Sequence, residues 1–188
     1  MVLFKLNKTL SEEDHFAFQV FQSLYSEYGK RWIRKRRISF IAYAVFILVF
    51  YVYIVGWTTY SIIYTTLIVL LTALYLLLLP KIVVRNIKSQ MKQMKKTSKL
   101  PYERVSTMEF YEDKFVDIDA ATRTEQSYSS IERVNIVKDQ YIYLHYSNVG
   151  VYILPIVQVK AQLNYEEFVN FLSGKCANVH TFSPKSKA

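Results

Sequence analysis

The sequence predicts a membrane protein of mixed α+β class, in which a two-helix transmembrane hairpin is joined to a small antiparallel β-sheet domain with a C-terminal helix. Three observations support this fold class. They are two long uncharged apolar runs, basic residues on both outer sides of that pair, and strand-like alternation in the C-terminal half. Hydrophobic residues make up 52% of the 188 residues and there are four glycines, which excludes a disordered or fibrous chain.

Residues 1–29 form the first predicted segment, a short strand within residues 1–10 followed by a helix over residues 12–28. Ser11 precedes three acidic residues, and both features suit the N-terminus of a helix. Apolar side chains cover more than half of this helix, so it needs a neighbour. We expect residues 1–29 to pack with the C-terminal domain, which makes the hairpin an insertion between them, with the membrane surface as the alternative position of the helix. We expect a bend at Gly29.

Residues 30–96 form the predicted hairpin, with apolar runs at 38–55 and 61–79. At about 1.5 Å of rise per residue, each run spans roughly 27 to 29 Å as a helix, close to the thickness of the bilayer interior. Backbone groups in lipid must be paired within the segment, so each run must be helical. The alternative is a pair of buried core helices, but a chain of this length has too few polar residues to cover them.

Basic residues flank the hairpin on both outer sides. Between Lys30 and Arg104 the chain has fourteen basic residues and one acidic residue. Beyond the proline boundary at Pro80, steps of three and four residues predict that the second span continues as an amphipathic helix with one basic stripe. We predict that ten of these flanking cations lie at the membrane interface, namely Lys30, Arg31, Arg34, Lys35, Arg36, Arg37, Lys81, Arg85, Lys88 and Lys92.

Cations at both outer ends of a hairpin predict that both termini are cytoplasmic. The join between the spans then faces outward with Trp57 and Tyr60, while Trp32 lies at the inner headgroup layer. Charge placed at bilayer boundaries argues for membrane orientation and against nucleic-acid binding. Anionic lipid headgroups are the expected partner surface. We expect generic electrostatic attraction to these headgroups and not selective binding of one lipid, because selective binding requires a pocket.

Residues 101–175 form the predicted sheet domain, which begins after a boundary between Thr97 and Pro101. Short turn-like joins separate the strands, so we expect an antiparallel meander. Asn164 caps a final helix over 165–172, Gly174 closes that helix, and 176–188 is a polar tail. The single cysteine excludes an intrachain disulfide and fits a reducing compartment. The expected strands are 105–111, 114–119, 123–128, 131–137, 141–146 and 150–154.

The sequence predicts no catalytic, cofactor or metal site, and hence no enzyme. His15, His145 and His180 lack ligand spacing to Cys176 or to carboxylates, and no phosphate loop or nucleophile elbow is present. Acidic residues at 112, 113, 117 and 119 could gather a cation, but solvated strand positions are the expected outcome. Sixteen tyrosines, many in the spans or the sheet, favour an interface with a protein partner or a second copy of the chain.

The basic-flanked hairpin is followed by the segments FYEDKF (110–115), YSSIERV (128–134), YIYLHY (141–146), YILP (152–155) and EEF (166–168). This order gives the chain a resemblance to the YcxB-like membrane proteins of bacteria. It implies a C-terminal module similar to a bacterial pleckstrin-homology (PH-like) domain, on the bacterial cytoplasmic membrane, with a binding role. Ile156 stands where relatives tend to carry a basic residue, which argues against anion binding there. An alternative role implied by similar domains is self-protection against a toxin or bacteriocin, or an envelope-stress response.

Overall fold

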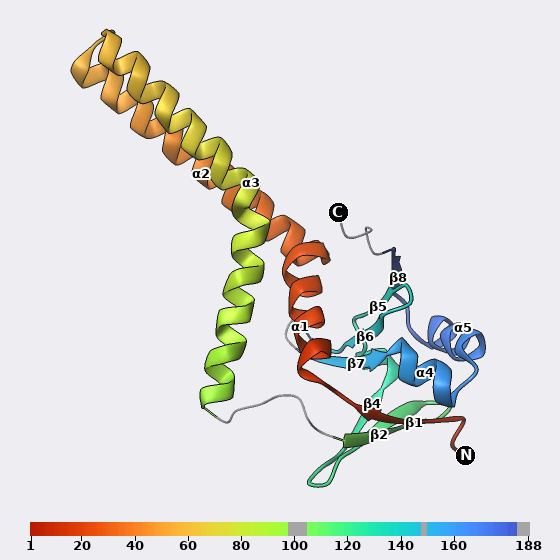
Figure 1. Ribbon diagram of the computed structural model, residues 1–188. Coiled ribbons are helices and arrows are strands. Elements are labelled where there is room, and N and C mark those ends of the chain that lie inside the picture. The colour runs from red at the N-terminus through yellow and green to blue at the C-terminus, as the bar shows by residue number, and fades with distance from the viewer. Residues whose placement is uncertain (98–104, 148–149, 184–188) are drawn as a thin grey trace. The chain divides into compact units, whose positions relative to one another are not determined.

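The computed structural model describes residues 1–97, 105–147 and 150–183. It consists of two compact units (Figure 1). Met1–His15 and Leu100–Ala188 form the sheet unit, and Phe16–Lys99 forms the helical unit. The boundary predicted between Thr97 and Pro101 falls on residues 98–101, which lie outside the described residues.

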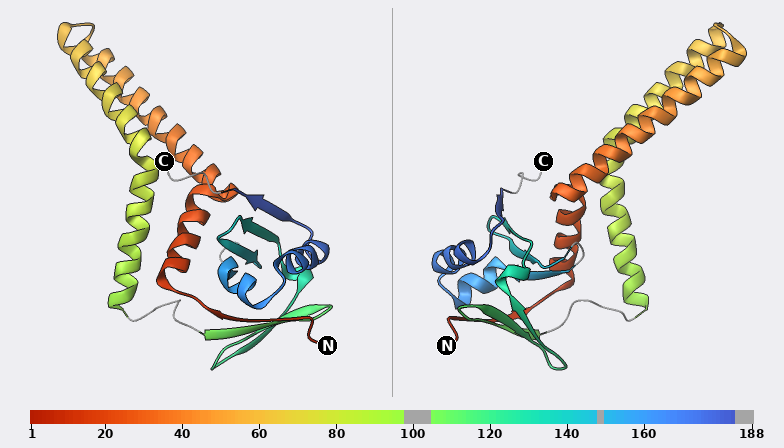
Figure 2. Two further views of the ribbon diagram at one scale, coloured as in Figure 1. Left: turned by 45° about the vertical axis from the view of Figure 1, so that its right-hand side comes forward. Right: turned by 180° about the vertical axis from the view of Figure 1, so that it is seen from behind.

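The helical unit contains two long helices, α2 (Glu27–Val55) and α3 (Thr59–Lys96), which run side by side in opposite directions (Figures 1 and 2). They include the two predicted apolar runs, and both are long and apolar enough to cross a membrane. Gly56 makes the join possible, because its φ of 73° is unfavourable for other residues. Thr58 and Ser61 then cap α3 reciprocally, with N–H to hydroxyl distances of 2.7 and 3.2 Å.

The predicted helix over 12–28 is divided into α1 (Glu12–Val20) and a π-helical turn, η1 (Phe21–Tyr25). The chain breaks at Ser26, whose ψ of 157° is extended, and not at Gly29 as predicted. The hydroxyl of Ser26 caps α2 by accepting from the Gly29 N–H at 3.0 Å. Gly29 is needed for a different reason. A Cβ there would lie 2.4 Å from the carbonyl oxygen of Ser23.

The amphipathic continuation predicted for the second span is confirmed. Pro80 does not end the helix but lies inside α3, which changes direction in its middle (Figure 1). Proline lacks the N–H that would bond the preceding turn, so a bend is expected there. Beyond it Ile87 and Met91 are buried, while the four basic residues predicted from 81 to 92 are exposed. The last cation of the predicted stripe, Lys99, lies outside the described residues.

The first sheet of the sheet unit combines the N-terminus with the chain beyond the hairpin. It contains β1 (Phe4–Thr9), β2 (Val105–Phe110), β3 (Lys114–Ile118) and β4 (Arg123–Ser127), in that order and all antiparallel. In the β1–β2 pair, Leu6 lies opposite Met108, and both side chains are fully buried. The long helical hairpin is therefore an insertion between two adjacent strands.

The second sheet corrects two expectations. It contains β5 (Arg133–Val137), β6 (Tyr141–His145), β7 (Val151–Pro155) and β8 (Val179–Phe182), in the order β7-β6-β5-β8. The strands thus form two sheets and not one meander, because a single 3₁₀ turn, η2 (Tyr128–Ser130), separates β4 from β5. The predicted polar tail supplies β8, which pairs with β5 in parallel. Part of the join between the strands expected at 141–146 and 150–154, residues 148–149, lies outside the described residues.

Two helices follow β7, where the sequence predicted one. The unpredicted helix is α4 (Ile156–Gln162), and α5 (Tyr165–Lys175) is the predicted terminal helix. The Asn164 cap is confirmed, since its side chain accepts from the Glu167 N–H at 3.4 Å. Gly174 does not close α5 but lies within it, and Cys176 is the residue at its C-terminal cap.

An aromatic cluster joins both sheets and α5 into one core. Phe110 and Phe168 are fully buried, with ring centroids 4.9 Å apart in an edge-to-face arrangement. Phe115 of β3 meets Tyr152 of β7 edge-on at 5.2 Å, which connects the two sheets. The apolar residues of α5 belong to this core, with Phe168 and Leu172 fully buried and Val169 packed against it.

Helix α4 covers the open edge of β1 through two glutamines. The Gln162 amide bonds both the N–H and the C=O of Asn7, at 2.9 and 2.8 Å. One helical turn earlier, Gln158 does the same for Thr9, at 3.0 and 2.8 Å. Each side-chain amide takes the place of a neighbouring strand at these residues, so the β1 edge of the first sheet is protected against pairing with another chain.

Candidate membrane-interface site

The basic residues predicted at the membrane interface all lie on the two long helices, and all ten are exposed. Six belong to the first turns of α2, and four follow Pro80 in α3. Because the helices run in opposite directions, both groups lie at the ends opposite to the Gly56 join. The structure thus brings the two predicted basic groups to the same end of the hairpin.

Very little negative charge balances these cations within the helical unit. Glu27 is the one acidic residue between positions 16 and 99 of the sequence. It forms an ion pair with Arg31 at 3.7 Å, one turn along α2. The basic residues of this unit far outnumber this one carboxylate, so the basic end of the hairpin carries a net positive charge that suits an external anion.

The aromatic residues predicted at the membrane interface lie at opposite ends of the hairpin, as their sequence positions indicated. Trp57 and Tyr60 lie at the join and are 80% and 73% exposed. Trp32 lies among the cations of α2, where the guanidinium of Arg36 stands over its ring at 5.6 Å from the centroid. This cation–π contact holds the Arg36 head group in place at an exposed site.

A groove beside Trp32 is the feature that sequence reasoning missed. Its volume is about 440 Å³. We call it the neck groove; six of its lining residues lie on α2 and one on α3, namely Trp32, Lys35, Arg36, Ser39, Phe40, Tyr43 and Tyr75. The rings of Phe40 and Tyr75 stack across the two helices at 4.0 Å.

The α2 side of the neck groove had a signal in the sequence. Steps of three and four residues from Trp32 to Tyr43 place these side chains on one face of a helix. Tyr75 had no such signal, because its place in the groove depends on how α3 pairs with α2. A second groove of about 350 Å³ lies next to Trp32 and is lined mostly by uncharged polar side chains of α1, η1, α2 and α3.

The sheet unit contains a buried lysine that the sequence did not single out. Lys8 of β1 is 4% exposed, and its ammonium lies 3.6 Å from Asp117 and 5.2 Å from the ring centroid of Tyr152. Burial lowers the pKa of Lys8, and the nearby carboxylate opposes that shift. Asp117 is thus an ion-pair partner and not the solvated strand residue that was expected.

Two buried titratable side chains of the sheet unit, His145 of β6 and Cys176 at the end of α5, are held in neutral forms. His145 is 1% exposed, and its Nε2 lies 3.0 Å from the amide nitrogen of Asn135. Burial, with a smaller effect from Arg133, lowers the pKa of His145 to about 4, so the ring is neutral at pH 7. Burial raises the pKa of the Cys176 thiol to about 11, which keeps it protonated and unreactive.

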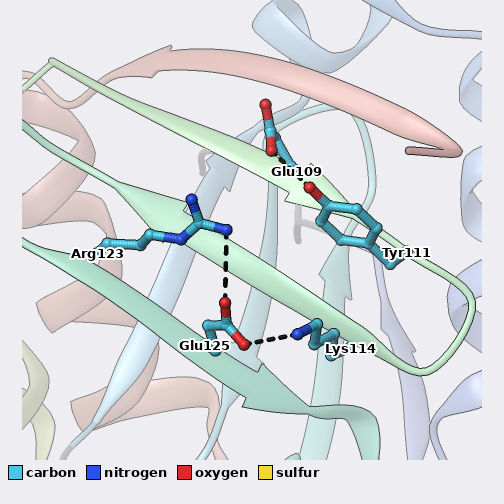
Figure 3. A network of polar contacts seen from close by, with 5 residues as sticks. All are labelled: Glu109, Tyr111, Lys114, Arg123 and Glu125. Atoms are coloured by element: carbon cyan, nitrogen blue, oxygen red, sulfur yellow. Dashed lines mark hydrogen bonds and ion pairs between the residues drawn. The ribbon is translucent and has the colours of Figure 1, made fainter. Parts of the chain in front are cut away.

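The outer face of the first sheet carries a polar network in which opposite charges are matched (Figure 3). Glu125 accepts from Lys114 at 2.6 Å and pairs with Arg123 at 3.4 Å. The hydrogen bond from Lys114 lowers the pKa of Glu125. Tyr111 donates to Glu109 at 2.8 Å, which lowers the pKa of that carboxyl. Within residues 1–97, 105–147 and 150–183, no three His, Cys, Asp or Glu side chains gather as metal ligands.

Comparisons with known proteins add no relative to this description. No protein family, no curated protein and no solved structure matches the sequence.

Proposed function

We propose that this chain is a two-span protein of the bacterial cytoplasmic membrane, and that its sheet unit is a PH-like, non-catalytic interaction module held at the cytoplasmic surface. The module binds a protein partner or the anionic membrane surface. The resemblance to YcxB-like proteins and the basic ends of the hairpin are the grounds for the bacterial and cytoplasmic placement.

The observation that carries this proposal is the exposure of the apolar helices. In the most apolar 18-residue stretch of each helix, the buried share is 6% in α2 and 11% in α3. Soluble monomers rarely expose contiguous apolar patches larger than a few hundred Å². A bilayer removes this cost, because lipid chains cover the apolar side chains while the helical backbone is already hydrogen-bonded.

Charge supports the proposed orientation. The cations at the outer ends of α2 and α3 favour the cytoplasmic side, where lipid headgroups are anionic and each nearby cation gains about 1 kcal/mol. Both segments of the sheet unit connect to these outer ends. The strands β1 and β2 therefore reach each other without any part of the sheet unit crossing the bilayer.

Labelling of single introduced cysteines in bacterial cells tests the proposal. Thr59 at the join and Ala121 in the β3–β4 turn are both exposed positions, whereas native Cys176 is buried and gives little background. A membrane-impermeant maleimide should label Thr59→Cys in intact cells and Ala121→Cys after the cells are broken. Labelling of Ala121→Cys in intact cells would refute the orientation, and extraction of the chain by alkaline carbonate would refute membrane insertion.

A further inference from the structure

The neck groove changes polarity along its length. Its α2 residues begin at Trp32 and end at Tyr43, a distance of about 16 Å along the helix axis. Lys35 and Arg36 lie before the apolar run at 38–55, whereas Phe40 and Tyr43 lie within it. The groove therefore passes from headgroup depth to acyl-chain depth if the hairpin spans the bilayer as proposed.

The basic end of the groove suits a phosphate. Lys35 and Arg36 supply two positive charges, and no carboxylate lines the groove. Arginine can bind a phosphate through two parallel N–H bonds, and lysine adds a compact charge. Because the guanidinium of Arg36 already stands over the Trp32 ring, this side chain loses less conformational freedom when it binds a phosphate.

The other end of the groove suits the apolar part of a lipid. Ser39 follows the cations with a hydroxyl that can bond a glycerol ester, and the stacked rings of Phe40 and Tyr75 form an apolar wall beyond it. A volume of about 440 Å³ lies within the usual range for small-molecule sites, about 300–1,000 Å³. It accommodates a headgroup with its glycerol and not a complete lipid.

From this order of charge, hydroxyl and aromatic groups we infer that the neck groove binds one anionic phospholipid of the cytoplasmic leaflet, with the phosphate at Lys35 and Arg36. The inference rests on the proposed membrane insertion. It makes the groove the source of lipid selectivity, and it assigns to the surrounding cations only the generic attraction of a basic surface.

Quenching of Trp32 fluorescence by brominated lipids tests this inference in the full-length protein. Trp57→Phe leaves Trp32 as the one tryptophan. The protein is reconstituted in phosphatidylcholine vesicles that contain a minor fraction of phosphatidylglycerol, with bromine near the headgroup end of the acyl chains of either lipid. Preferred binding should make brominated phosphatidylglycerol, at equal mole fraction, the stronger quencher of Trp32.

A matched pair of variants separates the groove from surface charge. Lys35→Gln with Arg36→Gln removes two cations that line the groove, and Arg34→Gln with Arg37→Gln removes two from the same segment that do not. The first pair should weaken the preference for phosphatidylglycerol about tenfold more than the second, which corresponds to about 1.4 kcal/mol. Equal losses in both pairs would overturn the inference.

The same data distinguish failure of the groove from failure of the proposed function. Equal quenching by brominated phosphatidylcholine and phosphatidylglycerol would leave the hairpin in the membrane but refute selective binding. No quenching by either lipid, together with no quenching of Trp57 in a Trp32→Phe protein, would place the hairpin outside the bilayer and refute both proposals.

Discussion

Acid should weaken the sheet unit through His145. The ring is buried against Asn135, and its pKa falls from 6.5 to about 4 on folding. A group whose pKa is lowered in the folded state binds fewer protons there than in the unfolded chain. Stability therefore rises with pH between about 4 and 6.5 and is lost as the pH falls through that window.

The magnitude follows from the shift. A difference of about 2.5 pKa units corresponds to about 3 kcal/mol over the whole window, of which about 2 kcal/mol is lost between pH 7 and pH 5. Urea unfolding of a domain of this size has a slope of about 1–2 kcal/mol per molar. The midpoint of the sheet unit should fall by about 1–2 M urea between these pH values.

Cys176 provides the assay, because it is buried in the core of the sheet unit and is the single cysteine of the chain. The full-length protein in detergent is equilibrated in urea, and a short pulse of a thiol reagent active in mild acid measures the fraction with an exposed thiol. His145→Gln should remove most of the difference between pH 7 and pH 5. An unchanged difference in that variant would refute the assignment to His145. Burial also lowers the pKa of His15, so a His15→Gln protein measured in parallel gives the separate contribution of that residue to the pH dependence.

Three further predictions follow from packing and pairing. Gly29→Ala should destabilise the helical unit in thermal unfolding followed by circular dichroism, because its Cβ would collide with a backbone carbonyl. Replacing Gln158 and Gln162 together by Ala removes four hydrogen bonds from the edge of β1 and should cost about 2 kcal/mol in the thiol assay. Lys8→Met should cost about 3 kcal/mol by leaving Asp117 without its partner, and adding Asp117→Asn should restore most of that loss.

Control variants are available for the glutamine pair and for Gly29. Lys160→Ala in α4 removes an exposed ion pair with Asp139 and should change stability by less than about 1 kcal/mol. Full stability of the double glutamine variant would show that water replaces the four bonds without loss. Gly174 lies in α5 with open space around it, so Gly174→Ala should be tolerated, in contrast to Gly29→Ala.

Local signals in the sequence were sufficient for several elements of the fold. The Asn164 cap, the apolar face of α5 and the buried side of α3 beyond Pro80 depend on residues within a few positions of each other. At Gly29 the deciding contact lies beyond the next helical turn, with the carbonyl groups of Gln22 and Ser23. Gly29 was expected to bend the helix, but it instead permits the close approach of η1, and the break lies at Ser26.

The candidate site was predictable only on one helix. The cations and Trp32 could be named from their positions beside an apolar run, and their spacing predicts one face of α2. The groove itself required Tyr75, which lies 35 positions beyond Phe40 in the sequence and meets it through the pairing of α2 with α3. A pocket needs two walls, and the sequence pattern described one of them.

The sequence by itself determined the hairpin, its basic ends and most strand positions, because apolar length, charge and alternation are local properties of a chain. Only the tertiary structure decided that β1 pairs with β2 across the inserted hairpin, and that residues of the expected tail form β8 beside β5. Strand partners are chosen by burial of a shared core and by backbone hydrogen bonds between distant segments. Neither can be recognised from the residues of one strand alone.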